Sequence, residues 1–269
     1  MRAVIAVLAV TWVLLTGCAI NPATGQKQLY LFTTADEIQL GRQAAPDVEK
    51  QYGGKLENPA LQAYVDSVGQ KVARVSDRRD LQYHYAVLNS DIPNAFALPG
   101  GYIYITRGLL TNIQDEAQLA AVLGHETGHV AARDGVQQLQ RSLGLSILVD
   151  AVGSTTKSSD AKAVAQVVAG LTSLRYSRQD EARADTLGAK YGYLSGYNPW
   201  GMVGLLQVLQ TQEKTESSRW TEMFQTHPLT ANRIADAQSH IQSTYPNARN
   251  NARLEYGKER FSAQTKGLH

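Results

Sequence analysis

The sequence has little of several features that mark common classes of protein. Among 269 residues there is one cysteine, Cys18, so no disulfide within the chain is expected to support the fold. Methionine occurs three times, which argues against a methionine-rich promiscuous binding surface. Lys and Arg number 26 against 24 Asp and Glu, a net charge of +2. This balance argues against nucleic acid as a partner, since such proteins carry a strongly basic face.

The first residues are typical of a secretion signal. Arg2 precedes an apolar stretch, 3–15, that is too short to cross a membrane as a helix. Residues 15–18, Leu-Thr-Gly-Cys, are similar to the bacterial lipoprotein signal, in which the cysteine becomes the acylated first residue. The alternative is a plain secretory signal with an incidental cysteine. We expect a signal peptide at 1–17 and lipidation of Cys18.

The residue after Cys18 indicates to which membrane such a lipoprotein would be sorted. In enterobacteria-like sorting, an Asp directly after the cysteine retains a lipoprotein in the inner membrane, and here Ala19 follows it. Multiple acyl chains hold a protein durably on a membrane. The sequence therefore predicts an outer-membrane lipoprotein that faces the periplasm, with a polar lipidated tether at 18–33.

Hydrophobic periodicity predicts an α+β, mainly helical domain over residues 34–245, followed by a polar C-terminal tail at 246–269. Thr34 and Glu37 are typical of a capping box that begins a helix reaching about residue 51, in which Pro46 would cause a kink or a division. Asn58 would cap a second helix. Further helices are expected at 114–132, 135–152, 160–175, 177–194, 199–213 and 230–243.

Three short segments between these helices have the pattern of strands. Alternating side chains from Leu81 to Val87 predict one strand. The runs 94–98 and 102–106, joined over Pro-Gly-Gly, are typical of a hairpin. We therefore expect a small antiparallel sheet beside the helix at 114–132. No repeat with a period of 20 to 50 residues is visible.

Two histidines and a glutamate have metal-binding spacing in residues 124–129, Gly-His-Glu-Thr-Gly-His. On a helix, His125 and His129 lie one turn apart on one face, so both can bind one metal while Glu126 points toward a bound water. The neighbouring residues are apolar on nearly all sides, which indicates a buried helix where unpaired polar groups are costly. The pattern predicts a catalytic metal centre with three protein ligands and one open position.

Glu181 and Asp185 are candidates for completing this centre. They too are four residues apart on a predicted helix, so Glu181 could bind the metal while Asp185 accepts a hydrogen bond from a ligand histidine. On spacing alone a solvated charged face is the commoner explanation, because Arg178, Asp180 and Arg183 lie among them.

The chain resembles the M48 family of metallopeptidases, in particular its periplasmic lipoprotein members. The matching stretches follow the family's order over roughly residues 30 to 245. They are 94–101, 106–110, 124–129, 177–185 and Thr226-His227-Pro228. The resemblance implies a zincin-like fold, one Zn²⁺ per chain, Glu181 as third ligand and Asp185 as the partner of a ligand histidine. Two positions depart from the family's pattern, since Thr127 replaces an apolar residue and Arg183 stands where relatives often carry a second acid.

A mechanism follows for such a zinc site. Zinc lowers the pKa of a bound water to about 7, and Glu126 would accept its proton and pass it to the leaving amine. The hairpin would provide an edge strand beside the active helix and bind an extended peptide through its backbone. An ordinary core hairpin is an alternative that is compatible with this role. The residues expected to bind substrate there are Asn94, Ala95, Phe96 and Ala97.

His227 stands before Pro228, near a predicted helix start, where a loop histidine without a catalytic role is the usual finding. In related members of the family this histidine lies close to the zinc. It would either block the open position as a fourth ligand or donate a hydrogen bond to the oxyanion. Arg233 on the next helix is expected to line the same cleft, whereas Tyr176 is expected to be a packing or surface residue.

These expectations describe a zinc metalloendopeptidase that cleaves misfolded or misassembled envelope polypeptides. Outer-membrane assembly machinery would be a further partner. A chaperone-like assembly factor for β-barrel clients, with cleavage secondary, is the alternative, although the chain has no helical-repeat extension for docking partners. An inactive scaffold is disfavoured because His125, Glu126, His129 and Glu181 are intact.

Overall fold

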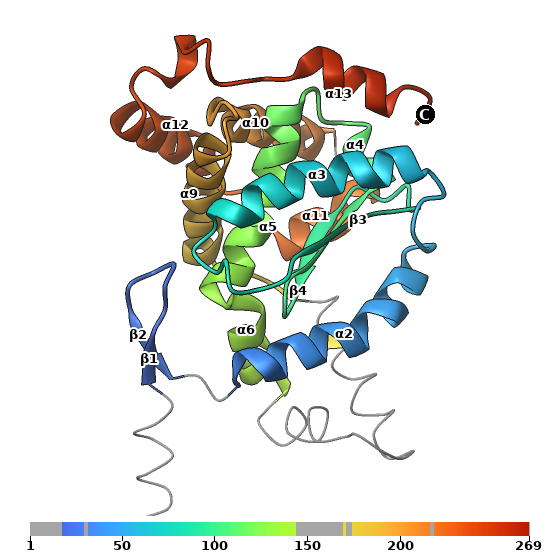
Figure 1. The fold of residues 1–269 in the computed structure, drawn as a ribbon, viewed down its shortest axis with the longest axis vertical. Coiled ribbons are helices and arrows are strands. Elements are labelled where there is room, and N and C mark those ends of the chain that lie inside the picture. Colours follow the sequence, from blue (N-terminus) through green and yellow to red (C-terminus); the bar gives the residue numbers. More distant parts are fainter. Residues whose placement is uncertain (1–17, 30–31, 144–168, 171–173, 216–217, 269) are drawn as a thin grey trace, which may run out of the picture.

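The computed structural model describes residues 18–29, 32–143, 169–170, 174–215 and 218–268. Helices form most of this part of the chain, a three-stranded sheet lies among them, and a separate two-stranded sheet lies near residue 18 (Figure 1). The strands are β1 (Cys18–Ile20), β2 (Lys27–Leu29), β3 (His84–Leu88), β4 (Ala95–Leu98) and β5 (Tyr102–Thr106). The helices are α2 (Thr34–Gln51), α3 (Pro59–Val75), α4 (Arg107–Leu110), α5 (Glu116–Ala132), α6 (Asp134–Leu143), α9 (Arg178–Leu194), α10 (Trp200–Lys214), α11 (Thr221–Thr226), α12 (Arg233–Thr244) and α13 (Lys258–Thr265).

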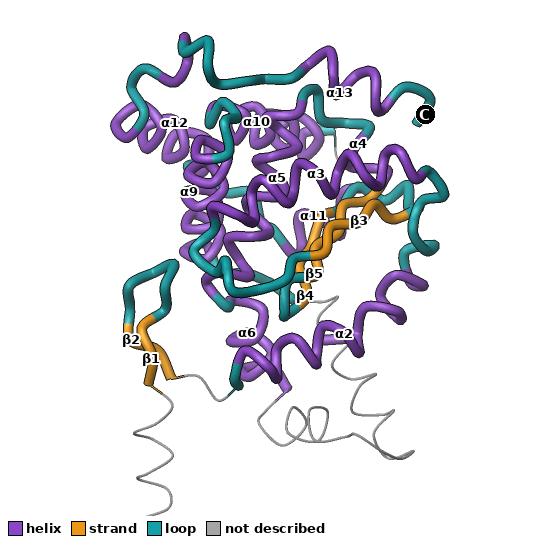
Figure 2. The backbone as a smooth tube through the Cα atoms, in the orientation of Figure 1, coloured by secondary structure: helices purple, strands orange, loops and turns teal. Residues whose placement is uncertain are grey.

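The predicted mainly helical α+β class is confirmed, and its sheet is mixed rather than wholly antiparallel. The order is β3-β5-β4, in which β4 and β5 form the expected antiparallel hairpin and β3 pairs in parallel with β5. Gly100 and Gly101 allow the hairpin turn, because both have positive φ values of 78° and 95°. The three strands gather between α2 and α3 (Figure 2). This arrangement leaves β4 at one edge of the sheet.

The first two long helices begin at side-chain caps. α2 starts with a capping box of Thr33 and Asp36, one residue earlier than the Thr34 and Glu37 pair that the sequence predicted. Glu37 is instead buried and bonded to Arg78 at 2.6 Å. Pro46 lies inside α2 without dividing it. α3 begins at the predicted cap, Asn58, whose side chain accepts a hydrogen bond from Leu61 N.

α5 is the central helix and is buried along its whole length. It packs against α3, α9 and α10 and against β4, so the metal-binding motif lies inside the domain. Its contact with α9 is close because glycines face each other, and a Cβ on Gly124 would lie 3.1 Å from Gly188 Cα. The helix ends at Arg133, which has a left-handed φ of 60°.

The two ends of the described chain pack onto this domain. β1 and β2 form a hairpin whose Asn21 is fully buried and donates from Nδ2 to Ala132 O at the end of α5, 2.8 Å away. In the C-terminal segment, Phe261 and Leu268 are buried in the core, and α13 lies where a polar tail was expected. None of the helices in the described ranges is long and apolar enough to cross a membrane.

Two predicted helices fall partly outside the described residues. The helix expected at 135–152 is described only as α6, which ends at Leu143. The helix expected at 160–175 lies almost entirely outside the described part; of its described residues, 169–170 are helical and 174–175 are not.

Candidate metal centre

Two histidines one turn apart on α5 form the base of the site. His125 and His129 are 6% and 1% exposed, and their Nε2 atoms lie 3.1 Å apart. Asp115 caps the start of this helix by accepting a hydrogen bond from Gln118 N. Because the helix is buried on every side, both rings are held in fixed positions by their neighbours.

The outer nitrogen of each ring faces a carboxylate. His125 Nδ1 lies 3.0 Å from Asp185 Oδ1, and His129 Nδ1 lies 2.9 Å from Asp134 Oδ2. A neutral imidazole that donates from Nδ1 carries a lone pair on Nε2. Two such lone pairs 3.1 Å apart repel each other unless a cation lies between them. The pair of rings is therefore arranged to hold a metal ion or, without one, a proton.

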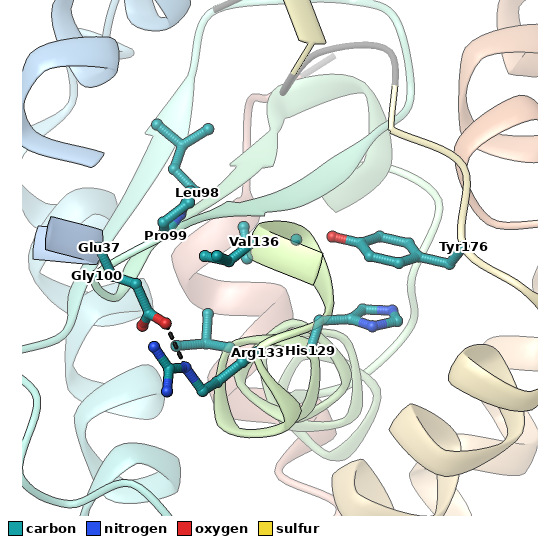
Figure 3. A pocket seen from close by; sticks show the side chains of 11 residues that line it. Glu37, Leu98, Pro99, Gly100, His129, Arg133, Val136 and Tyr176 are labelled. Carbon is teal, nitrogen blue, oxygen red and sulfur yellow. Dashed lines mark hydrogen bonds and ion pairs between the residues drawn. The ribbon is translucent and has the colours of Figure 1, made fainter. Parts of the chain in front are cut away.

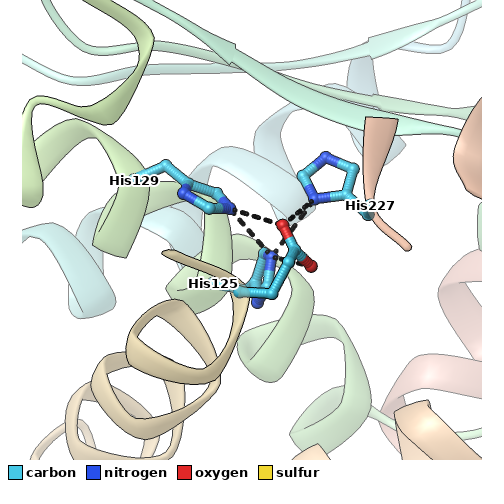
Figure 4. A group of neighbouring side chains, drawn as sticks. His125, His129 and His227 are labelled. Atoms are coloured by element: carbon cyan, nitrogen blue, oxygen red, sulfur yellow. Dashed lines mark hydrogen bonds and ion pairs between the residues drawn. The ribbon is translucent and has the colours of Figure 1, made fainter. Parts of the chain in front are cut away.

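A glutamate from α9 and a histidine from the segment after α11 complete the group. Glu181 Oε1 lies 3.3 Å from His129 Nε2, and Glu181 Oε2 lies 3.6 Å from His125 Nε2. His227 Nδ1 lies 3.0 Å from Glu181 Oε1 and 3.4 Å from His125 Nε2. Figure 4 shows the rings of His125 and His129, both from α5, converging with the ring of His227 from the segment after α11. All four side chains are buried, and their ligand atoms lie within 4.8 Å of one another.

The spacing of these atoms suits a tetrahedral ion. Bonds of about 2.1 Å to a tetrahedral zinc ion would place two ligand atoms about 3.4 Å apart. Five contacts between these side chains range from 3.0 to 3.6 Å, and all four ligand atoms lie within 4.8 Å of one another. Imidazole nitrogens and a carboxylate oxygen are also ligands that zinc accepts. The residues of this site therefore fit the metal that their pattern predicts.

The charges around the site favour ionised carboxylates. Burial lowers the pKa of His129, but Asp134 and Glu181 outweigh it and raise the pKa to about 10. Burial raises the pKa of Glu181, yet His227 and His125 hold it well below its usual range. The pKa of Asp185 is likewise lowered, because Arg233 outweighs the effect of burial. At neutral pH an incoming metal must therefore displace a proton from His129.

Glu126 lies beside the ligand group. It is 1% exposed, and its Oε1 is 3.6 Å from His227 Nε2. Its Oε2 has no hydrogen-bond partner within the described part of the chain. A buried carboxylate oxygen is costly to leave unpaired, so a water molecule or a substrate N–H would be stabilised there.

Arg233 joins two of the carboxylates at the site. Its Nε and Nη2 donate to Asp185 at 2.8 Å each, and its Nη1 lies 2.7 Å from Glu181 Oε2. Only 4% of the residue is exposed. In this conformation the guanidinium lies among the metal-site carboxylates, and its predicted role in lining the cleft stays a prediction.

β4 is an edge strand, as the sequence predicted, and its free edge is covered in this conformation. Thr106 N donates to Asn94 O, so the backbone N–H and C=O groups of Ala95 and Ala97 point away from β5. These two residues are 0% and 7% exposed. The buried side chain of Asn94 donates to Glu222 of α11 at 2.8 Å. It thereby ties the start of the edge strand to the helix that ends before His227, while Phe96 is partly exposed between the two alanines.

Tyr176 closes the site from another side. Its ring stacks on His129 with centroids 3.8 Å apart and is 5.3 Å from His227, and Figure 3 shows it beside His129. Its backbone N–H donates to Thr226 O at 3.2 Å. The adjoining crevice, which reaches β4 at Ala97, has a volume of about 10 Å³ and holds at most about one water molecule. A peptide side chain would need this region to open.

Sequence reasoning missed two residues of the site. Asp134 was not singled out, although it is an acid five residues after a ligand histidine, because no helical spacing relates the two. Tyr176 was expected to be a packing or surface residue, and only the structure brings it to the metal-binding group. The sequence did contain a signal for Asp134 and Tyr176, because each lies close to a segment that carries a predicted metal ligand.

Two buried histidines on one helix, with a glutamate from a second helix, define a metallopeptidase domain. The sequence profile described as Peptidase family M48 matches residues 59–241, and the chain belongs to this family. The matched range includes all four residues of the metal-binding group and Glu126.

Individual relatives differ in how much of their length they share with this chain. The beta-barrel assembly-enhancing protease of Escherichia coli strain K12 is 31% identical over 201 residues, covering 71% of this chain and 41% of that protein. The mitochondrial metalloendopeptidase OMA1 of Schizosaccharomyces pombe is 28% identical over 74% of this chain and 59% of its own length. Metalloprotease YcaL of Escherichia coli strain K12 is 22% identical over 88% of this chain and 96% of its own. The chain thus spans less than half of the first relative and nearly all of the last.

Proposed function

We propose that this protein is a zinc-dependent endopeptidase. The observation that carries the proposal is the group of four buried ligand atoms within 4.8 Å of one another, with an oxygen of Glu126 beside it that has no partner in the described part of the chain. His125, His129 and Glu181 would hold one zinc ion. When bound, zinc supplies a Lewis acid that lowers the pKa of water to about 7 and polarises a peptide carbonyl.

The chain's own residues carry the proton and hold the site in place. Glu126 accepts a proton from water and delivers it to the leaving amine, and its buried oxygen without a partner in the described part of the chain supports this role. Asp185 accepts a hydrogen bond from His125 Nδ1 and so fixes which nitrogen faces the metal. Arg233 neutralises Asp185 and Glu181, which lowers the cost of burying two carboxylates together.

His227 keeps the site closed in the proposed resting state. Its Nδ1 lies among the ligand atoms, at 3.0 Å from Glu181 Oε1, where it would act as a fourth ligand. Of the two roles considered for it, this geometry favours blocking the open position over donating to an oxyanion. Because α11 is tied to Asn94 through Glu222, movement of His227 would also uncover the edge of β4.

The edge of β4 is the proposed binding site for substrate. The free N–H and C=O groups of Ala95 and Ala97 would pair with an extended polypeptide, with Asn94 and Phe96 completing the strand. Backbone pairing makes little demand on sequence, which suits misfolded or misassembled envelope proteins. One relative's name, beta-barrel assembly-enhancing protease, agrees with outer-membrane assembly as the setting.

We also propose that Cys18 is the lipidated first residue of a mature outer-membrane lipoprotein facing the periplasm. The first described strand starts at Cys18, and Asn21 is held against the last residue of α5. Three residues of chain span at most about 10 Å, so the anchor lies close to the end of the metal-binding helix. The polypeptides nearest to this site would be those at the membrane surface.

Glu126→Gln tests the peptidase proposal. Glutamine has the same shape and cannot accept the proton, so zinc content should be retained while casein cleavage falls by about 10²- to 10⁴-fold. Glu213→Gln, on the exposed face of α10, is the matched control and should cleave like the parent. Cleavage by Glu126→Gln at the parental rate would refute the proposal.

The same variant separates the peptidase from a chaperone-like assembly factor. In cells that lack the protein, full restoration of envelope integrity by Glu126→Gln would favour the assembly factor. Failure to restore it, with normal amounts of variant protein, would favour the peptidase.

A further inference from the structure

The two ligand histidines of the metal centre are supported in the same way. His125 Nδ1 faces Asp185, and Asp185 is bonded to Arg233. His129 Nδ1 faces Asp134 at 2.9 Å, and Asp134 Oδ1 accepts a hydrogen bond from Arg183 Nη2 at 2.5 Å. In each case the outer nitrogen of the imidazole ring contacts a carboxylate, and that carboxylate contacts a guanidinium.

We propose that Asp134 and Arg183 act together as positioning residues for His129. The pair would fix the ring so that Nε2 faces the metal, and so set the affinity of the centre for zinc. This inference rests on the zinc site proposed above. It assigns a function to Arg183, which stands where relatives often carry an acid.

The backbone places Asp134 for this purpose. α5 ends at Arg133 in the left-handed conformation, with φ of 60°, which is uncommon for a residue other than glycine. The turn carries the chain back so that the next residue, Asp134, reaches the ring of His129 five positions earlier. Arg133 is itself held there by the buried Glu37 and by Phe32 O. The position of Asp134 is thus determined by contacts on both sides of the turn.

Arg183 extends the arrangement to the second helix of the site. It lies on α9 between Glu181, a metal-binding residue, and Asp185, the partner of His125. Its guanidinium also bonds Asp180 at 2.6 Å, toward the surface. One turn of α9 therefore reaches the metal group in three ways. Glu181 belongs to the group itself, Asp185 contacts His125, and Arg183 contacts Asp134, which in turn contacts His129.

A purely structural ion pair is the alternative. Asp134 is the first residue of α6, where an acid stabilises the helix dipole, and Arg183 could simply neutralise it. The geometry favours the positioning role, because Asp134 is 5% exposed and uses one oxygen for each partner. Asp134 therefore satisfies a buried imidazole and a partly buried guanidinium at once, which an uncharged side chain of the same size cannot do.

Asp134→Asn is the informative substitution. An amide has one oxygen and one NH₂ group, so the NH₂ must face either the His129 Nδ1 proton or the Arg183 guanidinium. Loss of a histidine's outer partner typically weakens metal binding about 10- to 100-fold. We expect the zinc dissociation constant, measured by competition with a chelating indicator, to rise by that factor. A value within twofold of the parent would refute the inference.

Removing Arg183 as well should leave the amide of Asp134→Asn with a single donor, His129 Nδ1, to satisfy. In Asp134→Asn/Arg183→Ala the amide can turn its oxygen to His129, so we expect the double variant to regain most of the lost zinc affinity. A structural ion pair predicts no such rescue. Zinc binding by the double variant as weak as that of Asp134→Asn, or weaker, would refute the coupling of the two residues.

Asp77→Asn is the matched control, because Asp77 pairs with a residue on the same helix as Arg183. Asp77 pairs with Lys190 of α9 at 2.9 Å and contacts no residue of the metal group. It should change thermal stability of the metal-free protein without altering zinc affinity. The controls also separate the two proposals. A parent protein that binds no zinc contradicts the proposed function, whereas tight zinc binding shared equally by parent and Asp134→Asn contradicts this inference alone.

Discussion

Replacement of His227 by alanine should increase peptidase activity. His227 Nδ1 lies 3.0 Å from Glu181 Oε1 and 3.4 Å from His125 Nε2, among the atoms that would bind the metal. As the proposed fourth ligand it would occupy the position that a substrate carbonyl needs. The side chain is 2% exposed, so a substrate cannot pass it without displacing it. The variant would remove the obstruction and leave His125, His129 and Glu181 to bind the metal.

The size of the effect follows from the contact that must break. A hydrogen bond to a charged group contributes roughly 1.5 to 3 kcal/mol. Since about 1.4 kcal/mol corresponds to a factor of ten, opening should become easier by roughly 10- to 150-fold. Cleavage of a quenched peptide at saturating zinc should rise by a similar factor. The zinc dissociation constant should rise too, because one of four ligands is lost.

His240→Ala is the control, since His240 is half-buried on α12 and outside the metal group. It should leave both zinc affinity and peptide cleavage unchanged. A fall in kcat of His227→Ala at full zinc occupancy would refute the blocking role and support donation to the oxyanion. Unchanged cleavage with unchanged zinc affinity would show that His227 does not bind the metal.

Two further predictions concern pH and membrane attachment. His129 has a folded pKa of about 10, above its unfolded value of 6.5, so its contribution to the stability of the metal-free protein is complete below pH 6.5 and lost as pH rises toward 10. Thermal melts after chelation should show a decline over this range that His129→Gln lacks; parallel curves would contradict the shift. Cys18→Ala should abolish acyl labelling and cleavage before residue 18, and continued acyl labelling of the variant would exclude Cys18 as the anchor.

The sequence was most informative where one element contains a whole pattern. His125, Glu126 and His129 belong to one helix, so their meeting requires only helical geometry. The hairpin of β4 and β5 was likewise predictable, because the turn and both strands are consecutive. The parallel pairing of β3 with β5 was not, since it depends on which side of the hairpin the earlier strand joins.

Other features depended on choices that a sequence leaves open. Residues 33–37, Thr-Thr-Ala-Asp-Glu, contain two overlapping capping boxes, and the structure uses the first because Glu37 is needed to bond Arg78 and Arg133 in the core. Thr127 places a hydroxyl on the buried helix, where it lies 2.9 Å from Tyr85 Oη and donates to Leu123 O at 2.6 Å. In each case a partner far away in the sequence determines the local arrangement.

The role of Asp134 shows the same limitation at the metal centre. The link between His129 and Asp134 requires a left-handed turn at Arg133, and the link to Arg183 requires the approach of α9. That approach depends on glycine, since a Cβ on Gly188 would lie 2.9 Å from His125 N. The position of each ligand thus depends on how closely α5 and α9 pack. A change at their interface would therefore alter zinc binding and proton transfer without touching a ligand.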